Sequence, residues 1–307
     1  MSDDETADCV IVGGGPAGLT AAIYTARFRL RTIVIDAGNS RAAQIPCTRN
    51  HAGFPDGISG ADLLDRMRAQ AIRFGAELRS ERVLGLEGRY GDFMAQLAEG
   101  QAVRARAILL ATGVSNHRPD IADALHDDAV KRGWLRYCPV CDGFEVTDEN
   151  VGVIGSGARA VKEATFLRAY TERVTIIAPH GEADFDAAQR ADMAAIGVAM
   201  LHGPASDFRA GTQGLSLQAG GKRVTFDAIY PALGSTVHSE LAAGLGALLT
   251  EDGCIKVDAH QRTSVPGLYA AGDAVIGLDQ ISHAMGEAGV AATTIRNDLA
   301  AMKPQLR

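Results

Sequence analysis

Three features that define common functional classes are missing from the sequence. No run of apolar residues approaches the roughly 18 that a membrane-spanning helix needs, so we expect no membrane span. Positive charge is not in excess, because 30 Lys and Arg face 37 Asp and Glu and leave a net charge of −7. A nucleic-acid partner is therefore not expected, since phosphate binding requires a basic face. The acidic start MSDDETADCV does not resemble a signal peptide, which predicts a cytoplasmic protein.

Cysteines are few, and their number is odd. Of the five, Cys9, Cys47 and Cys254 are isolated, whereas Cys138 and Cys141 stand two residues apart. A disulfide scaffold is not expected in a chain of 307 residues without a secretion signal. A structural zinc site would need two further ligands at similar spacing, so no metal is expected.

Two interpretations of the pair remain, an inert pair of core cysteines and a redox-active dithiol. The dithiol is favoured because thiols at this spacing can close a small disulfide and have lowered pKa values. Asp142, directly after Cys141, could carry the protons that dithiol chemistry releases and takes up.

The length suits two domains, and residues 10–36 open the first. An apolar run ending at Val12 predicts a buried strand, and Gly13, Gly15 and Gly18 then form a G-x-G-x-x-G turn. A helical pattern follows, and a second strand ends in Asp36. In such a unit the glycines permit the turn and the close approach of a pyrophosphate, and the acid binds a ribose hydroxyl. The unit predicts dinucleotide binding.

The same unit recurs 142 residues later. Gly155, Gly157 and Ala160 take the places of the three glycines, and a helix and a strand follow again. Ala178 stands where the first unit has its acid. We therefore predict an α/β protein with two Rossmann-like dinucleotide-binding domains, the second of which either binds a nucleotide weakly or no longer binds one. Buried strands in ILLATG (108–113) and YAAGDA (269–274) are assigned to the first domain.

In these motifs the chain resembles the low-molecular-weight thioredoxin reductases. The resemblance covers nearly the whole chain in the order GGGPAG, NHAGFPDGISG, ATG, CPVCDG, GSGARA and GLYAAGDA, followed by a C-terminal helix. The C-x-x-C-D-G core between two glycine motifs is highly specific to that family.

The resemblance implies a homodimer of two-domain subunits. An FAD domain would comprise residues 1–114 and 235–307, and a pyridine-nucleotide domain carrying the cysteines, residues 115–234, would be inserted in it. Cys141 would be the thiol next to the flavin, Cys138 would exchange with the substrate disulfide, and Asp142 would be the acid. The substrate would be a thioredoxin-like protein or a small disulfide.

The resemblance also implies a set of FAD-binding residues from several parts of the chain. Asn50 belongs to the family's N-x-P-G segment, although Ala52 replaces the proline. The full set is Gly13, Gly15, Pro16, Ala17, Gly18, Asp36, Asn50, Thr112, Gly113, Gly272, Asp273, Gln280 and Ile281.

The second domain departs from the family where NADPH would bind. Members that use NADPH have arginines after the second strand of this unit, whereas this chain has Ala178, Pro179 and His180, followed by acidic residues. Arg159, inside the turn of Gly155, Gly157 and Ala160, could contact a phosphate or block the site. The sequence thus leaves NADPH and NADH open as donors.

Two alternatives remain open. One is a member that does not use NAD(P)H, either a dithiol oxidase that reduces oxygen or a reductase driven by ferredoxin or a second flavin. The other, from a different class, is a flavin-binding sensor without turnover.

Overall fold

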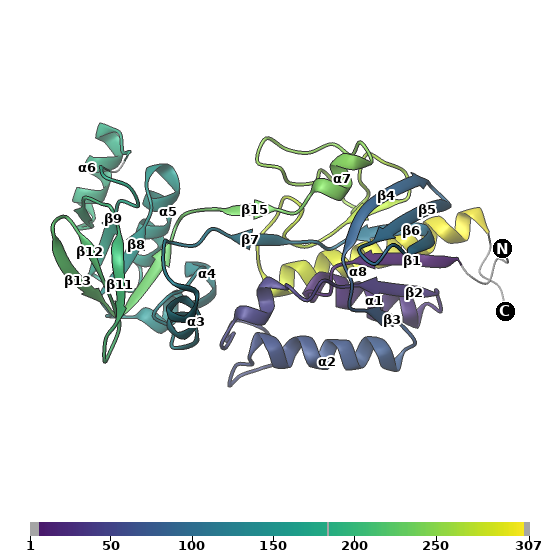
Figure 1. Cartoon of the computed structure of the whole chain (residues 1–307), viewed down its shortest axis with the longest axis horizontal. Helices are drawn as coiled ribbons and strands as arrows, with labels where there is room; N and C mark the ends of the chain where they lie inside the picture. Colours follow the sequence, from purple (N-terminus) through teal and green to yellow (C-terminus); the bar gives the residue numbers. More distant parts are fainter. Residues whose placement is uncertain (1–5, 183, 304–307) are drawn as a thin grey trace. The chain divides into compact units, whose positions relative to one another are not determined.

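The structure is a computed structural model, and it describes residues 6–182 and 184–303. The chain divides into two compact units. Unit 1 comprises residues 1–44, 59–115 and 236–307, and unit 2 comprises residues 45–58 and 116–235. β7 (Val114–Asn116) and β15 (Ser235–Val237) pair where the chain passes from one unit to the other (Figure 1).

Unit 1 is built on a seven-stranded sheet with the order β3-β2-β1-β6-β5-β4, in which β16 also pairs with β6. β3, β2, β1, β6 and β16 run parallel, and β4 and β5 extend the sheet as antiparallel strands. The elements are β1 (Ala7–Val12), α1 (Pro16–Arg27), β2 (Thr32–Ile35), η2 (Arg41–Gln44), α2 (Gly60–Arg73), β3 (Glu77–Arg79), β4 (Val83–Arg89), β5 (Asp92–Leu97), β6 (Ala102–Leu110), α7 (Glu240–Gly244), β16 (Leu268–Ala270) and α8 (Ile281–Met302).

Alternation along β1 divides the core of unit 1 between the two faces of its sheet. Val10 and Val12 join one hydrophobic cluster, and Cys9 and Ile11 join the other. α1 and α8 cover the second face through rows of alanine, whose small side chains let the two helices approach the strands closely. The predicted strand, helix and strand of the first glycine unit are confirmed. The buried strands predicted in 108–113 and 269–274 are confirmed as the ends of β6 and β16, which stop at Leu110 and Ala270.

Unit 2 holds a four-stranded parallel sheet, β10-β9-β8-β14, and a three-stranded antiparallel sheet, β11-β12-β13. The sequence analysis predicted the first of these sheets through its glycine unit and did not predict the second. The elements are α3 (Asp123–Lys131), α4 (Pro139–Asp142), η3 (Gly143–Val146), β8 (Val151–Ile154), α5 (Gly157–Leu167), β9 (Val174–Ile177), α6 (Ala187–Ala195), β10 (Ala199–Leu201), β11 (Ser206–Ala210), β12 (Leu215–Ala219), β13 (Lys222–Phe226) and β14 (Ala228–Pro231).

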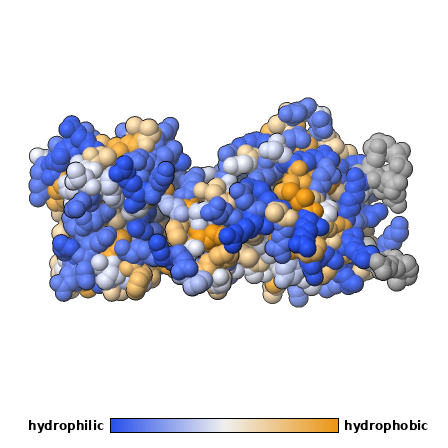
Figure 2. Space-filling model, turned by 90° about the horizontal axis from the view of Figure 1, so that it is seen from below, coloured by the Kyte–Doolittle hydropathy of each residue, from blue (hydrophilic) through white to orange (hydrophobic). Residues whose placement is uncertain are grey.

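The surface carries hydrophobic residues only in small groups on the face that Figure 2 presents, with hydrophilic residues between them. Within residues 6–182 and 184–303, no helix combines the length and the apolar character that crossing a bilayer would require.

One polar cluster in unit 1 ties α8 to the end of the sheet. The buried Tyr269 donates a hydrogen bond to Asp298 over 2.7 Å, and Arg262 binds the same carboxylate through two nitrogens. The hydrogen bond from Arg262, together with that from Tyr269, holds the pKa of Asp298 below its ordinary value despite partial burial.

Replacing Asp298 with asparagine should lower the free energy of unfolding by about 2 kcal/mol at pH 7, because charge-assisted hydrogen bonds are lost. A lowered carboxyl pKa stabilises the fold above the ordinary value of about 3.9 and loses that effect as pH falls through the folded-state pKa. The difference between the variant and the parent should therefore disappear in strongly acidic buffer. Urea unfolding from pH 7 down to about pH 2 measures it. Asp92→Asn, which breaks an exposed ion pair with Arg104, is the control expected to have little effect.

Candidate active site

The first glycine turn lies at the carboxyl end of β1 and is closely packed. Gly13 has a φ of +110°, and a Cβ there would overlap the carbonyl oxygen of Ala111. A Cβ at Gly18 would overlap the carbonyl oxygen of Gly13. α1 begins at Pro16 with Gly15 as its N-cap, and in the described part of the chain no side chain caps it. Its first N–H groups and its positive dipole end are therefore available to an anion.

Asp36 follows β2 and lies over this turn. A Cβ added to Gly14 would overlap its carboxylate, which accepts a hydrogen bond from the backbone of Gly38 over 3.1 Å. Arg68 of α2 lies 3.7 Å from the same carboxylate. This places an acid beside the N-terminus of α1, where the ribose of a dinucleotide would meet it.

Two neighbouring strands of the same sheet bring further predicted residues together. β6 and β16 are paired up to Leu110 and Ala270. Thr112 and Gly113 come shortly after β6, and Gly272 and Asp273 come shortly after β16. The hydroxyl of Thr112 donates to the carbonyl of His238.

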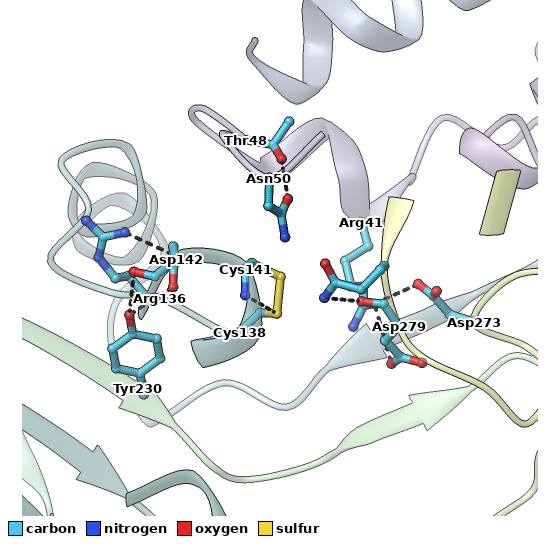
Figure 3. Close-up of a disulfide and its surroundings, with 11 residues drawn as sticks. Arg41, Thr48, Asn50, Arg136, Cys138, Cys141, Asp142, Tyr230, Asp273 and Asp279 are labelled. Carbon is cyan, nitrogen blue, oxygen red and sulfur yellow. Dashed lines mark hydrogen bonds and ion pairs between the residues drawn. A yellow bond between two sulfur atoms is a disulfide. The ribbon is translucent and has the colours of Figure 1, made fainter. Parts of the chain in front are cut away.

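Asp273 has a partner that the sequence analysis missed. Arg41 donates to it over 2.7 Å and lies 3.4 Å from Asp279 (Figure 3). Burial raises the pKa of Asp273, and Arg41 opposes that shift. The sequence gives no signal for this pair, whose members lie 232 residues apart.

The start of α8 lies in the same unit. Gln280 is its N-cap and Ile281 its first residue. One turn later His283 lies 3.0 Å from Glu287, which accepts a hydrogen bond from the backbone of Gly272 over 2.7 Å. Burial raises the pKa of Glu287. α8 is thereby joined to the turn that carries Asp273.

Asn50 lies in the segment 45–58, which clusters with unit 2. Its side-chain oxygen accepts a hydrogen bond from the hydroxyl of Thr48 over 2.9 Å. Cys47 of this segment is a partly exposed free thiol that lies against Gly57.

Cys138 and Cys141 form a disulfide at the start of α4 (Figure 3). Cys138 is the N-cap, Pro139 is the first helical residue, and the backbone N–H of Cys141 donates to the sulfur of Cys138 over 3.2 Å. Both cysteines are partly exposed residues.

The other cysteines of the chain are free. Cys9 is fully buried on β1, and burial raises the pKa of its thiol to about 12, which leaves it unreactive. Within residues 6–182 and 184–303, no group of three or more His, Cys, Asp or Glu side chains could hold a metal ion.

Asp142 ends α4 and is largely withdrawn from solvent. Arg136 and Tyr230 each donate a hydrogen bond to its carboxylate, over 3.0 and 2.8 Å. Burial raises the pKa of Asp142, and these two partners oppose the shift. The sequence analysis singled out Asp142 and missed both partners.

The second glycine turn has the predicted strand and helix but differs in its surroundings. Gly155 packs against Ala232, where a Cβ would come within 2.9 Å of the alanine Cβ, and Gly157 opens α5 with a φ of +62°. The backbone N–H of Gly157 donates to the carbonyl of Asp184 over 2.9 Å. One of the N–H groups that would face a pyrophosphate is thus already bonded to the chain's own loop.

Charged groups on α5 complete this region. Arg159 lies beside Gly234 and Ala160 is buried. Burial raises the pKa of Glu163 to about 7, with Arg159 and Lys162 opposing the shift. Ala178, the buried residue after β9, offers no acid to a ribose.

The two glycine units and the disulfide define a protein that combines dinucleotide-type folds with a cysteine pair, and comparison with known proteins gives the family. Residues 7–288 match the pyridine nucleotide-disulphide oxidoreductase family, to which the chain belongs. Its relatives there include the thioredoxin reductase of Streptomyces clavuligerus, which is 34% identical over 295 residues, or 90% of this chain and 87% of the relative. The thioredoxin reductase of Listeria innocua is 31% identical over 99% of this chain and 98% of its own length.

The fold agrees with a solved structure of the same kind. The thioredoxin reductase of Giardia duodenalis aligns with a TM-score of 0.84 at 27% identity and covers 96% of this chain and 99% of its own. The chain is therefore an FAD-dependent disulfide oxidoreductase of the thioredoxin-reductase type, as its motifs predicted.

The residues of unit 1 fit FAD. The overlaps at Gly13 and Gly18 show that neither the turn nor the packing of α1 against it has room for a side chain, as in a dinucleotide-binding unit. The uncapped start of α1 and the acid Asp36 suit the phosphates and the ribose of its ADP half. Asp273 lies at the end of a neighbouring strand of the same sheet, where a ligand of an open α/β sheet binds.

Proposed function

We propose that this enzyme reduces the disulfide of a thioredoxin-like protein through Cys138 and Cys141. The observation that carries the proposal is the partly exposed disulfide at the start of α4. Its curated relatives named thioredoxin reductase support a protein disulfide as substrate, and a small disulfide is the alternative.

Each residue has a stated role in the proposed reaction. FAD, when bound, takes up an electron pair and passes it on. Opening the Cys138–Cys141 bond consumes two electrons and yields two thiols once two protons are added. The thiolate of Cys138 then attacks a sulfur of the substrate, forms a mixed disulfide and expels one substrate thiol. Cys141 resolves this intermediate, which restores the disulfide and releases the substrate as a dithiol, while Asp142 exchanges protons with the pair.

The proposed FAD-binding set is the one that the sequence analysis named. Gly13, Gly15, Pro16, Ala17, Gly18 and Asp36 would hold the ADP half. The rest of the cofactor would be contacted by residues that follow two strands of the same sheet and by the start of α8. They are Thr112 and Gly113 after β6, Gly272 and Asp273 after β16, and Gln280 and Ile281 at α8. Asn50 is proposed to join them from the segment 45–58.

The proposed domains are an FAD domain of residues 1–114 and 235–307 and a pyridine-nucleotide domain of residues 115–234. The two compact units support this division outside residues 45–58, which cluster with unit 2. A homodimer is supported by large hydrophobic side chains that are exposed on two helices of unit 1, because exposed apolar residues often mark an interface. They are Tyr24 on α1, Phe28 at the C-terminal end of α1, and Val290 on α8. A cytoplasmic location is supported by the three free cysteines that the chain has in addition to the Cys138–Cys141 pair, because reducing compartments keep thiols unpaired.

The electron donor is tested by anaerobic titration of the flavin absorbance with NADPH, NADH and a dithiol in separate experiments. We expect NADPH and NADH to bleach the flavin at rates within about tenfold of each other, because the arginines that would bind the 2′-phosphate bidentately are missing. If NADPH bleached the flavin more than a hundredfold faster than NADH, the expectation of similar rates would be wrong, and another group would have to bind the 2′-phosphate.

Two specific observations favour a second candidate function. The carbonyl of Asp184 already accepts from the N–H of Gly157, and Ala178 leaves the ribose without an acid. Both features suit an enzyme that receives electrons without a nicotinamide nucleotide. In the same titration this enzyme would be bleached by the dithiol alone.

A further inference from the structure

The carboxylate of Asp142 accepts hydrogen bonds from two side chains outside α4. Nη1 of Arg136 donates to Oδ2 over 3.0 Å, and the hydroxyl of Tyr230 donates to Oδ1 over 2.8 Å. Figure 3 shows the carboxyl turned toward these two residues, on the side away from the disulfide. Each carboxylate oxygen thus has a strong hydrogen-bond donor while the cysteines are oxidised.

Both donors are fixed by the surrounding fold. Nε of Arg136 donates to the carbonyl of Gly133 over 2.8 Å, and its backbone N–H donates to the carbonyl of Ile229 in β14 over 2.9 Å. Tyr230, the next residue of that strand, is fully buried. A carboxyl held by two such donors keeps this orientation until one of the two hydrogen bonds breaks, because neither partner can follow it when it turns toward the sulfurs.

The surroundings of Asp142 shift the pKa of its carboxyl in opposite directions. Burial raises the pKa of its carboxyl, the cation of Arg136 and the hydroxyl of Tyr230 lower it, and the nearby Glu145 of η3 raises it further. Glu145 itself lies 3.8 Å from Arg49. The carboxylate also raises the pKa of Arg136, although burial alone would lower it. The two donors therefore favour the carboxylate within a site that otherwise favours the neutral acid.

We propose that Arg136 and Tyr230 are positioning residues that control proton exchange between Asp142 and the Cys138–Cys141 thiols. The proposal rests on the proposed function, in which this pair cycles between disulfide and dithiol. Opening the S–S bond takes two electrons and requires two protons. Asp142 supplies one and solvent the other, and both return when the disulfide forms again. The two donors hold the carboxyl away from the sulfurs while these are bonded, and they set how readily it accepts a proton.

The test uses the thiols of the reduced protein as reporters. Their rate of reaction with a pyridyl disulfide is followed from pH 4 to pH 9, and an inflection that Asp142→Asn removes is assigned to Asp142. Arg136→Met should move this inflection to higher pH by roughly one unit or more, because the lost cation had stabilised the carboxylate. Tyr230→Phe should move it in the same direction by less. Arg136→Lys, which keeps the charge, should restore most of the parent profile.

Two controls separate positioning from a structural effect. Arg132→Met breaks an exposed pair with Asp128 in the same unit and should leave the inflection in place. Adding Arg136→Met to Asp142→Asn should change the profile no further, since the arginine would act only through the carboxyl. An inflection that stays in place in both Arg136→Met and Tyr230→Phe would overturn the proposal, as would a further change in the double variant. Tyr230→Phe keeps the test decisive if Arg136→Met does not fold.

The outcome can be read separately from the proposed function, because a protein reduced chemically beforehand needs neither thioredoxin nor a physiological electron donor in the assay. A shifted inflection in a protein that reduces no thioredoxin would leave this inference standing and would overturn only the proposed substrate.

Discussion

Replacing Cys141 with serine is expected to abolish disulfide turnover while leaving the protein folded and yellow. A hydroxyl cannot form the disulfide that stores the electron pair, so turnover should fall at least about a thousandfold. The fold should persist because neither cysteine belongs to the buried clusters of unit 2. Absorbance of bound flavin, circular dichroism and thioredoxin-coupled turnover measure the three properties. Cys254→Ser removes a free, partly buried thiol and should change none of them.

The same variant distinguishes the roles of the two sulfurs. If Cys138 attacks the substrate, Cys141→Ser should accumulate a mixed disulfide with it, because the resolving thiol is missing. Cys138→Ser should form no such adduct. Mass spectrometry of the reaction with oxidised thioredoxin tests this directly. An adduct in Cys138→Ser alone would reverse the assignment, and loss of flavin from Cys141→Ser would make the pair structural.

Much of the fold could be predicted because its signals are local. A strand, a glycine turn, a helix and a second strand are consecutive in the chain, so the first unit could be assigned from residues 10–36 alone. Its repeat at a constant offset assigned the parallel sheet of unit 2 in the same way. The antiparallel strands β4, β5 and β11–β13 carry no comparable motif, and their pairing depends on contacts between segments that local periodicity does not identify.

The candidate site shows the same division. Cys138, Cys141 and Asp142 could be found because the three stand within five residues of one another. Tyr230 reaches Asp142 across 88 residues, and it occupies a position on β14 that reads as an ordinary buried strand residue. Arg41 meets Asp273 only after the sheet has formed. Such partners have no signal of their own in a single sequence, since any buried tyrosine or arginine could satisfy the same pattern.

The hydrogen bond from the N–H of Gly157 to the carbonyl of Asp184 also has no signal in the sequence. The sequence revealed that the second unit lacks an acid and the arginines, which are absences at fixed positions. It could not reveal that a backbone carbonyl bonds the glycine turn, because a carbonyl is present in every residue and only the path of the loop brings it there.

Substituting Gly18 with alanine is expected to have the largest effect on cofactor binding. A Cβ at this position would overlap the carbonyl oxygen of Gly13, so α1 would have to move away from β1. The N–H groups at the start of that helix would then miss the pyrophosphate, and a displacement of about an ångström costs roughly a hundredfold in a well-positioned site. We therefore expect FAD affinity to fall at least about a hundredfold and the apoprotein to lose about 1–3 kcal/mol of stability.

Rebinding of FAD to the apoprotein, followed by quenching of flavin fluorescence, measures this loss. Gly244→Ala in α7 is the matched control, because a Cβ there meets no atom within 4 Å and the residue is exposed. It should bind FAD as the parent does and should be as stable or slightly more stable, since alanine favours a helix over glycine. Unchanged affinity in Gly18→Ala would mean that the N-terminus of α1 does not bind the phosphates. Equal losses in both variants would instead point to a general loss of stability, because only Gly18 lies between the helix and the turn.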